Sequence, residues 1–245
     1  MPSESPISLA LVAWGNAWLR GQVGLDEAAD QVETITGPTV VAGPDGDVPL
    51  RRYLADLRTA GLSELRLALP APGDPLGLSG PPAFNSAAVD AGQAAIAVLK
   101  DACAGLVPEP DVRGSSYVGV RLAVHESGPV RQDLPSLAEA ERELSAAMRS
   151  ATEALSGVDG PAQERPGRLG RAGAELAPGY PGRAHRVAQL AGRLAAVVRA
   201  ADERGLTSGQ IAASGEALRE LDRAVRRALV AAHHAIFEPV TPDRA

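Results

Sequence analysis

Two apolar seams at helical spacing occupy the last quarter of the chain, and they constrain its fold more than any other feature. In each seam an aliphatic residue recurs every three or four positions, which places all of them on one face of an α-helix. The first seam consists of Val187, Leu190, Leu194, Val197 and Ala201, and the second of Leu218, Leu221, Val225, Leu229, Ala232 and Ile236. Each seam covers fewer than four heptads, so the pattern predicts two antiparallel helices joined near residues 205–209 and not an extended coiled coil.

The residues available for a core also favour closely packed helices. Of the 245 residues, 45% are hydrophobic but only 3% are aromatic, so the interior must be built from Leu, Val, Ile and Ala. A further helix is predicted over residues 136–156, because Ser136 and Glu139 have the spacing of a capping box. Residues 157–182 contain eleven Gly or Pro, a composition typical of a flexible segment.

Both periodicities occur in the first half of the chain. Alternating apolar residues predict short strands, whereas helical spacing with Asp47 and Asn85 as N-caps predicts intervening helices. The expected strands are residues 39–43, 64–69, 94–99 and 118–126, of which 94–99 could instead continue a helix. The expected helices are residues 7–21, 25–32, the segment after Asp47 that ends at Gly61, and Asn85 to Gly92.

The predicted fold class is therefore α+β. We expect a small N-terminal α+β domain over residues 1–130, with three or four strands. A helical region over 134–245 should follow, dominated by the long antiparallel helix pair and interrupted by the flexible Gly/Pro/Arg-rich segment 157–182.

Within the segment LPAPGDPLGLSGPPAFN, residues 69–85, regular structure is excluded from Pro70 to Pro82, because this part holds five prolines and three glycines. In the favoured interpretation it is a rigid connector, in which Asn85 caps the next helix and Leu76, Leu78 and Phe84 pack on the core. In the alternative it is a binding loop at the end of a strand. The candidate ligand-binding residues are then Asp74, Ser79 and Asn85.

No motif for catalysis or cofactor binding stands out. The chain lacks a P-loop, a correctly spaced GxGxxG and a GxSxG elbow, and its single cysteine, Cys103, lies among small residues without a nearby histidine. His234 and Glu238 could share a helical face, but two ligands do not make a metal site. We therefore expect no cofactor and no metal, assign no catalytic residue, and regard an enzyme as the weaker option.

Charge is distributed unevenly along a chain whose net charge is −6. Residues 1–133 carry 9 basic and 16 acidic side chains, net −7, whereas residues 165–204 carry eight arginines against three acids, net +5. The candidate basic patch comprises Arg165, Arg168, Arg171, Arg183 and Arg186. Nucleic-acid binding is disfavoured because almost no aromatic residue is interleaved with these arginines, and a solvated Arg-rich segment, or one docked on the acidic N-terminal half, is the alternative.

Trp14 and Trp18 lie one helical turn apart and are the only two tryptophans. Such a pair belongs to the core, or, if its face is exposed, forms an anchor for a partner helix or a second copy. The apolar run Ile7 to Leu19 is too short to span a bilayer and Glu4 stands where a signal peptide would carry positive charge. We therefore expect a cytoplasmic protein that does not associate with membranes.

Three strings carry a resemblance to a known family: LPAPGDPLGLSGPPAFN, PGYPGRAHRVAQLAGRLAAVV and LRELDRAVRRALVAAHHAIFE. They are similar to an uncharacterised conserved family from actinobacteria, the high-GC Gram-positive bacteria, over most of the chain. The resemblance implies a cytosolic protein without an assigned reaction.

The leading hypothesis is a non-enzymatic interaction or regulatory protein, whose partner is another protein or a second copy of the chain. The alternative is a small-molecule-binding protein or enzyme that uses the loop 70–85. A weaker alternative is nucleic-acid binding through the Arg-rich segment 165–204.

Overall fold

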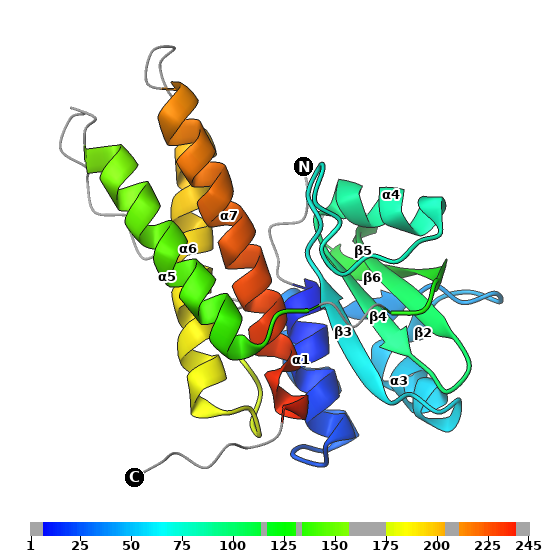
Figure 1. Cartoon of the computed structure of the whole chain (residues 1–245). Coiled ribbons are helices and arrows are strands. Elements are labelled where there is room, and N and C mark those ends of the chain that lie inside the picture. The colour runs from blue at the N-terminus through cyan, green and yellow to red at the C-terminus, as the bar shows by residue number, and fades with distance from the viewer. Residues whose placement is uncertain (1–6, 114–116, 131–133, 157–174, 204–210, 239–245) are drawn as a thin grey trace, which may run out of the picture.

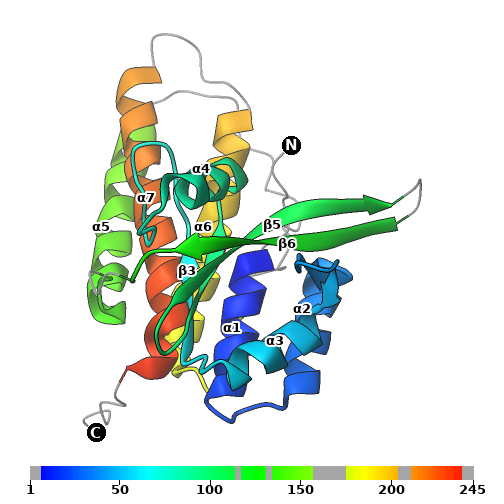
Figure 2. The same ribbon diagram turned by 90° about the vertical axis from the view of Figure 1, so that its right-hand side faces the viewer.

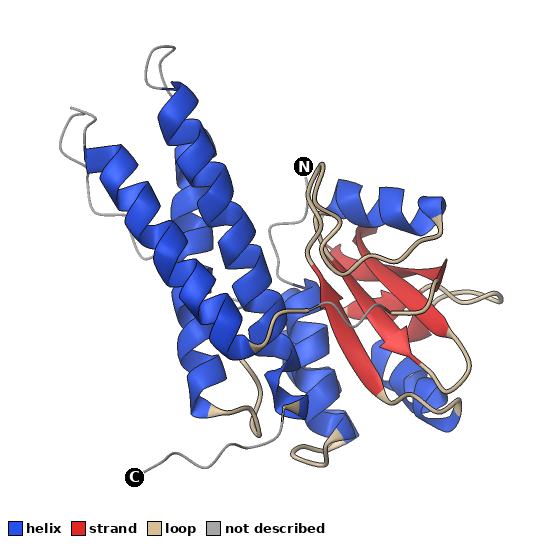
Figure 3. Cartoon of the chain, in the orientation of Figure 1, coloured by secondary structure: helices blue, strands red, loops and turns tan. Residues whose placement is uncertain are grey.

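The computed structural model describes residues 7–113, 117–130, 134–156, 175–203 and 211–238 (Figure 1). These residues form seven α-helices, one short 3-10 helix and six strands. The helices are α1 (Ile7–Leu19), α2 (Leu25–Thr36), α3 (Leu50–Thr59), α4 (Pro82–Ala91), α5 (Leu137–Ser156), α6 (Gly182–Glu203), α7 (Ile211–His234) and η1 (Ala235–Phe237). The strands are β1 (Thr39–Val41), β2 (Val48–Pro49), β3 (Glu64–Ala68), β4 (Ala94–Val98), β5 (Cys103–Arg113) and β6 (Tyr117–Ser127). The predicted α+β class is confirmed, and Figure 3 shows the strands gathered on one side and the long helices on the other.

The strands form one mixed sheet in the order β2-β1-β6-β5-β4-β3. Every neighbouring pair is antiparallel except β1 and β6, which are parallel. The strands predicted at 39–43, 64–69, 94–99 and 118–126 are all present, and 94–99 is a strand and not a helix. Six strands exceed the three or four expected, because β5 and the two-residue β2 were not anticipated.

Strand β5 was not predicted from the sequence, because it contains two prolines. Pro108 and Pro110 cannot donate a ladder hydrogen bond, and a proline therefore argues against a central strand. In the structure they oppose Leu122 and Val120 of β6, while β4 pairs with β5 only as far as Leu106. The prolines thus lie on a stretch that pairs with β6 alone among the described strands, where a missing N–H is tolerated and discourages further strand pairing.

Helix α1 lies between the sheet and the helical bundle, and ten of its thirteen residues are buried. The polar Asn16 within it has a specific partner: its Nδ2 donates to Leu65 O and its Oδ1 accepts from Leu65 N, both at 2.8 Å. Leu65 belongs to the edge strand β3, so the amide takes the place of a neighbouring strand. Gly15 allows this approach, because a Cβ at that position would collide with Leu65 Cδ1.

Helix α4 covers the opposite face of the sheet. Phe84 is fully buried there with Ala88, Ala94, Ile96 and Val107 in a small apolar cluster separate from the main core. Gly105 is required beneath it, because a Cβ on this residue would overlap the Phe84 ring. The main core lies on the other face and continues from α1 and β3 into α5, α6 and α7 without a break.

The long antiparallel helix pair is confirmed as α6 and α7. Helix α7 packs against both α5 and α6, whereas α5 and α6 contact each other little. Of the predicted seam on α6, Val187 is buried but Val197 is 43% exposed, and the neighbouring Val198 is buried in its place. The apolar stripe of α6 is therefore wider than its contact with α7.

Three local predictions were wrong. Asp47 does not cap α3, which follows Pro49; it forms ion pairs with Arg113 and Arg121 instead. Asn85 is not an N-cap either, because α4 already begins at Pro82. Helix α2 continues to Thr36, beyond the predicted end at residue 32, and Gly37 follows it with a φ of 86°.

The segment 157–182 is described only from residue 175 onward, and residues 157–174 lie outside the described residues. Leu176, Ala177 and Tyr180 are buried, and α6 begins at Gly182. The carboxyl end of the segment is therefore part of the core, and the prediction of a flexible segment does not hold there.

Candidate functional site

The loop that carries Asp74 is held against α7 by a single arginine. Arg226 donates from Nη2 to Asp74 Oδ2 at 2.9 Å, from Nη1 to Leu69 O at 2.9 Å and from Nε to Asp222 Oδ2 at 2.8 Å. The side chains of Arg226 and Asp74 are only 14% and 18% exposed. Arg223, by contrast, is 63% exposed and reaches Asp74 only at 3.8 Å. Asp74 thus joins the loop to the helical bundle.

The two other candidate residues of this loop also have partners within the fold. Ser79 Oγ donates to Gly128 O at 3.1 Å, and Asn85 Oδ1 accepts from Gly80 N at 3.0 Å. Leu76, Leu78 and Phe84 are buried, as the connector interpretation expects. Ser79 and Asn85 therefore meet where Gly128 N donates to Gly80 O, whereas Asp74 is directed at α7. Ligand binding by the three residues remains a prediction.

Only part of the proposed basic patch lies in the described chain. Arg165, Arg168 and Arg171 fall outside the described residues. Arg183 forms an ion pair with Glu141 of α5 at 2.6 Å, and Arg186 is exposed one turn further along α6. Only Arg183 and Arg186 of the five arginines are among the described residues, and nucleic-acid binding through the patch remains a prediction.

The tryptophans of α1 are partly buried against the main core. Trp14 Nε1 is buried without a hydrogen-bond partner among the described residues. The guanidinium carbon of Arg58 lies 5.3 Å from the centre of the Trp18 ring, a cation–π contact. Both side chains contribute to the core, and their role as an interface anchor remains a prediction.

Near the buried end of α7, His233 and Tyr180 form consecutive hydrogen bonds within the core. His233 is fully buried with Nδ1 2.7 Å from Leu229 O, and its burial lowers its pKa to about 4, which the hydrogen bond to Leu229 opposes. Tyr180 Oη donates to His233 O at 3.0 Å, and burial raises the pKa of Tyr180. Since both side chains stay neutral at pH 7, these hydrogen bonds stabilise the core and provide no charge for binding a ligand.

His234, next to it, faces the sheet instead. Its Nε2 lies 3.7 Å from Glu64 Oε2, and burial and Arg66 lower its pKa while Glu64 and Glu238 oppose that shift. Glu238 Oε1 accepts from Leu137 N at 3.0 Å, so it caps α5. Among the described residues no group of three or more His, Cys, Asp or Glu could hold a metal ion. In the same part of the chain no helix has the length and apolarity needed to cross a membrane.

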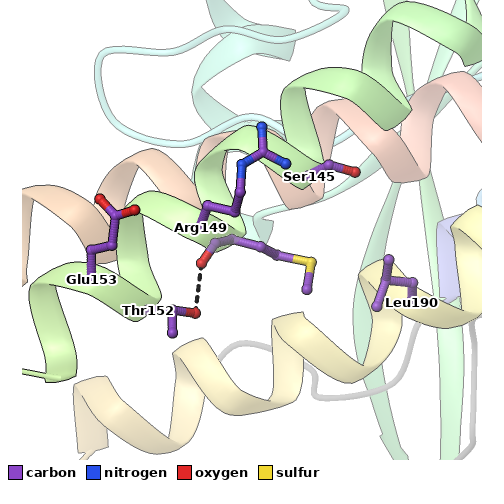
Figure 4. Close-up of a pocket in the computed structure, with 6 residues that line it drawn as sticks. Ser145, Arg149, Thr152, Glu153 and Leu190 are labelled. Carbon is purple, nitrogen blue, oxygen red and sulfur yellow. Dashed lines mark hydrogen bonds between the residues drawn. The ribbon is translucent and has the colours of Figure 1, made fainter.

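An open hollow of about 410 Å³ lies between α5 and α6 (Figure 4). Figure 4 shows Ser145, Arg149, Thr152 and Glu153 along α5 with Leu190 opposite them on α6; Met148 completes the lining. The hydroxyls of Ser145 and Thr152 donate to carbonyls of their own helix, at 2.9 and 2.8 Å. The hydroxyl hydrogens of Ser145 and Thr152 are therefore already used, which leaves Met148 and Leu190 as the apolar part of the lining and Arg149 and Glu153 as its charged part.

The hollow is closed at one end and continues as an apolar strip at the other. The Arg183–Glu141 ion pair joins α6 to α5 before the hollow begins. Further along α6, Leu194 is half-buried and Val197 is 43% exposed. Leu190 and Leu194 thus pack partly on the core, and Val197 extends their apolar seam to solvent. We call Met148, Leu190, Leu194 and Val197, with the hollow, the bundle groove.

The second feature is a ribbon formed by the outer parts of β5 and β6, which projects from the body of the molecule (Figure 2). We call residues 109–113 and 117–121 the arm. Val112 and Val118 are direct cross-strand partners on the arm and are 68% and 76% exposed. Pro110 is exposed as well and, two residues from Val112, shares its face. The arm thus presents a continuous apolar stripe to solvent.

The opposite face of the arm carries a network of ion pairs. Arg113 pairs with Asp111 at 2.9 Å and with Asp47 at 3.0 Å, and Arg121 pairs with Asp47 at 2.9 Å and Glu109 at 3.4 Å. Each exposed pair adds little stability by itself. Together they connect both strands of the arm to the turn before β2, so the apolar stripe is held in a fixed conformation before any partner binds.

The matches to known protein families span both halves of the chain. Residues 8–136 match the N-terminal domain of Rv1486c-like proteins, and residues 138–230 match the C-terminal domain of Rv1486c-like proteins. The chain belongs to the Rv1486c-like family. Two proteins of Mycobacterium tuberculosis, the uncharacterized proteins Rv1486c and MT1533, are each 32% identical to it over 192 residues, which is 62% of this chain. The aligned region spans 64% of the length of these relatives.

No solved structure matches the chain. The resemblance to an uncharacterised actinobacterial family is confirmed by the Rv1486c-like matches. The matches to the family name no activity. The arm and the bundle groove are therefore the surfaces of this Rv1486c-like protein from which we infer a function.

Sequence reasoning missed both of these surfaces. The arm was hidden because its first strand contains Pro108 and Pro110. The groove was hidden because Leu190, Leu194 and Val197 were assigned to one seam with Val187, and only the three-dimensional arrangement shows which part of the seam is uncovered. The one available signal was the width of the α6 stripe, which exceeds what a single neighbouring helix covers.

Proposed function

We propose that this chain is a non-catalytic interaction protein that binds another protein through its arm. The observation that supports the proposal is the Val112–Val118 pair, with exposed fractions of 68% and 76% on a projecting, ion-paired ribbon. Single exposed hydrophobic residues are ordinary, but adjacent ones that form a patch mark contact surfaces. Rigid presentation lowers the entropy lost on binding, which favours a contact function for this ribbon.

The partner would bind the face of the arm and not its edge. Strand addition requires N–H donors along the edge, and Pro108 and Pro110 remove two of them from β5. The apolar face of Pro110, Val112 and Val118 remains as the contact surface. A partner for this surface must therefore offer an apolar groove, and the contact does not depend on pairing with a strand edge.

We also propose a cytoplasmic location. The single cysteine at position 103 has no partner within the chain for a disulfide, which is usual in reducing compartments. A regulatory role for the interaction is part of the same proposal and depends on identifying the partner.

Site-specific photo-cross-linking tests the proposal in the cells that produce the protein. A photo-reactive amino acid at position 118 should give an adduct with a protein chain, and the same amino acid at position 52 should not. Arg52 is a suitable control because its side chain is 73% exposed and lies on α3, outside the arm. Absence of any adduct from both position 112 and position 118 would reject the proposal.

A further inference from the structure

We infer that the partner of the arm is a second copy of this chain, and that the arm of each copy inserts into the bundle groove of the other. The inference rests on the proposed function, because it requires the arm to be a contact surface. It adds the acceptor site on the partner and therefore the identity of the partner.

The two surfaces are complementary in shape and chemistry. The arm is a projecting apolar ridge of Pro110, Val112 and Val118. The groove is a hollow with Met148 and Leu190 in its lining, flanked by polar side chains of α5, next to the exposed Val197. The described chain has four strongly exposed large hydrophobic residues; two lie on the arm, one at the groove, and Val124 lies further along β6. Contact between arm and groove would cover three of the four.

A chain cannot bring its own arm to its own groove. Figure 2 shows the arm pointing to one side of the molecule and α5 lying on the opposite side, with α1 between them. The ion pairs that hold the arm to the turn at Asp47 keep it in this direction. The groove that receives the arm must therefore belong to another molecule.

The charges around the two surfaces are also complementary. The arm and its supporting turn carry four acids, Asp45, Asp47, Glu109 and Asp111, against two arginines, net −2. The exposed rim of the groove carries Arg149, Arg186 and Arg193 against Glu153, net +2. All three rim arginines are exposed. Their charge would attract an acidic partner surface.

The positions of the rim arginines support their role. Arg186 and Arg193 lie four residues before and three residues after Leu190, so they neighbour it on the surface of α6. An apolar contact surrounded by opposite charges is the usual arrangement of a specific interface. The same asymmetry holds for the whole chain, in which residues 1–133 carry net −7.

One arm and one groove per chain allow a closed two-fold dimer in which each copy donates its arm to the other. In such a pair the same contact is made twice and no arm or groove stays exposed, whereas a single contact would leave one of each free. We therefore expect a closed dimer with two equivalent arm-to-groove contacts.

The mass of the purified full-length chain in solution, measured by light scattering over a dilution series, tests the dimer. The wild type should have twice the mass of one chain. Val112→Glu/Val118→Glu in the arm and Leu190→Glu in the groove should each weaken the dimer at least about tenfold. Because Leu190 is half-buried, the exposed pair Arg149→Glu/Arg193→Glu serves as a second groove variant, and circular dichroism checks the fold of all three.

Mixing the variants distinguishes this dimer from any other. An arm variant keeps its groove and a groove variant keeps its arm, so the mixture should form a pair with one intact contact, which neither variant forms alone. In a Cys103→Ser background, Val118→Cys and Val197→Cys copies should also form a mixed disulfide under mild oxidation. A Val118→Cys copy with an Arg52→Cys copy is the matched control and should form none.

The outcomes separate the inference from the proposed function. A wild type that stays monomeric at all concentrations, or a dimer that survives both arm and groove variants, overturns the inference. If photo-cross-linking from position 118 still yields a different protein chain, the proposed function stands and only the second-copy partner is wrong. If neither cross-linking nor association depends on the arm, both fail.

Discussion

At the scale of single residues, the clearest determinant of the fold is Asn16. The sequence shows it only as a polar interruption of an apolar run, yet its amide satisfies both backbone groups of Leu65 on an edge strand. A buried backbone group without a partner costs about 1–3 kcal/mol. The close approach of α1 to β3 therefore depends on this side chain and on the glycine that precedes it.

We predict that Asn16→Ala lowers the free energy of unfolding by about 2–4 kcal/mol, because two buried backbone groups lose their partner. Urea denaturation monitored by circular dichroism measures the change. Asn85→Ala is a matched control, since it removes one part-buried hydrogen bond to Gly80 and should cost about 1 kcal/mol. Equal losses in the two variants would contradict the role assigned to Asn16.

His233 should make stability depend on pH. Its pKa is lowered by burial to about 4 in the folded state, against about 6.5 in an unfolded chain. Between these two pKa values the unfolded state binds more protons at this histidine than the folded state does. The contribution of His233 to the free energy of unfolding is therefore constant above about pH 7 and decreases as the pH falls. We expect His233 to account for a loss of about 2 kcal/mol in the free energy of unfolding between pH 7.5 and pH 5.

Urea denaturation of His233→Leu at the two pH values isolates this contribution. The variant should lose about 2 kcal/mol less than the wild type over the interval. His185→Gln removes a half-buried histidine of α6 and should leave the wild-type loss in place. An unchanged pH dependence in His233→Leu would show that His233 is not held neutral by burial.

At the scale of elements, the loop 69–85 illustrates what sequence reasoning can provide. Its prolines and glycines correctly indicated that no helix or strand forms between β3 and α4, and Leu76, Leu78 and Phe84 are buried as expected. The predicted cap at Asn85 was wrong, and the connector interpretation itself remains a prediction. The partner of Asp74 could not be predicted, because Arg226 lies 152 residues away in sequence. Contacts over such separations follow from the tertiary arrangement, which local patterns do not encode.

We predict that Asp74→Ala lowers the free energy of unfolding by about 1.5–3 kcal/mol, because Arg226 loses a largely buried charged partner. Arg226→Ala should cost more, since it leaves Asp74, Asp222 and Leu69 O without this donor. Arg223→Ala is the control and should stay within about 0.5 kcal/mol, as expected for an exposed surface residue. Urea denaturation gives all three values; equal effects of Asp74→Ala and Arg223→Ala would contradict the fastening role of Asp74.

The helices were easier to predict than the strands for a physical reason. Long amphipathic helices such as α5 and α7 repeat their pattern over many turns, so single exceptions do not obscure them. Strand β5 had only its alternation to identify it, and Pro108 and Pro110 contradict that signal locally. The arm belongs to this ambiguous strand, whereas the bundle groove lies between α5 and α6, two helices that were predicted. For the groove only the tertiary arrangement shows which side chains stay exposed, so the candidate site was largely beyond prediction.

At the scale of the whole molecule, α1 joins the sheet to the bundle. Its buried residues belong to one hydrophobic cluster that also contains residues of β3, β4, α5, α6 and α7. A division into separate domains at residues 1–130 and 134–245 remains a prediction from the sequence. Because the hydrophobic core is shared, neither part has a complete hydrophobic core of its own.

We predict a single cooperative unfolding transition for the whole chain. Fluorescence of Trp14 and Trp18 reports on α1, and far-ultraviolet circular dichroism is dominated by the long helices α5–α7. The two signals should coincide along a urea titration because the core is continuous. Separate midpoints would show that the sheet and the bundle unfold independently.

Native mass spectrometry of the protein purified gently from its own cells tests the central claim that the arm is a protein-binding surface. The wild type should carry a second protein chain, and Val112→Glu/Val118→Glu should appear as a single chain. A second chain of the same mass supports the arm-to-groove dimer, and one of a different mass supports the proposed function with another partner. A wild type that is a single chain with a small bound molecule, retained in the arm variant, would contradict the account.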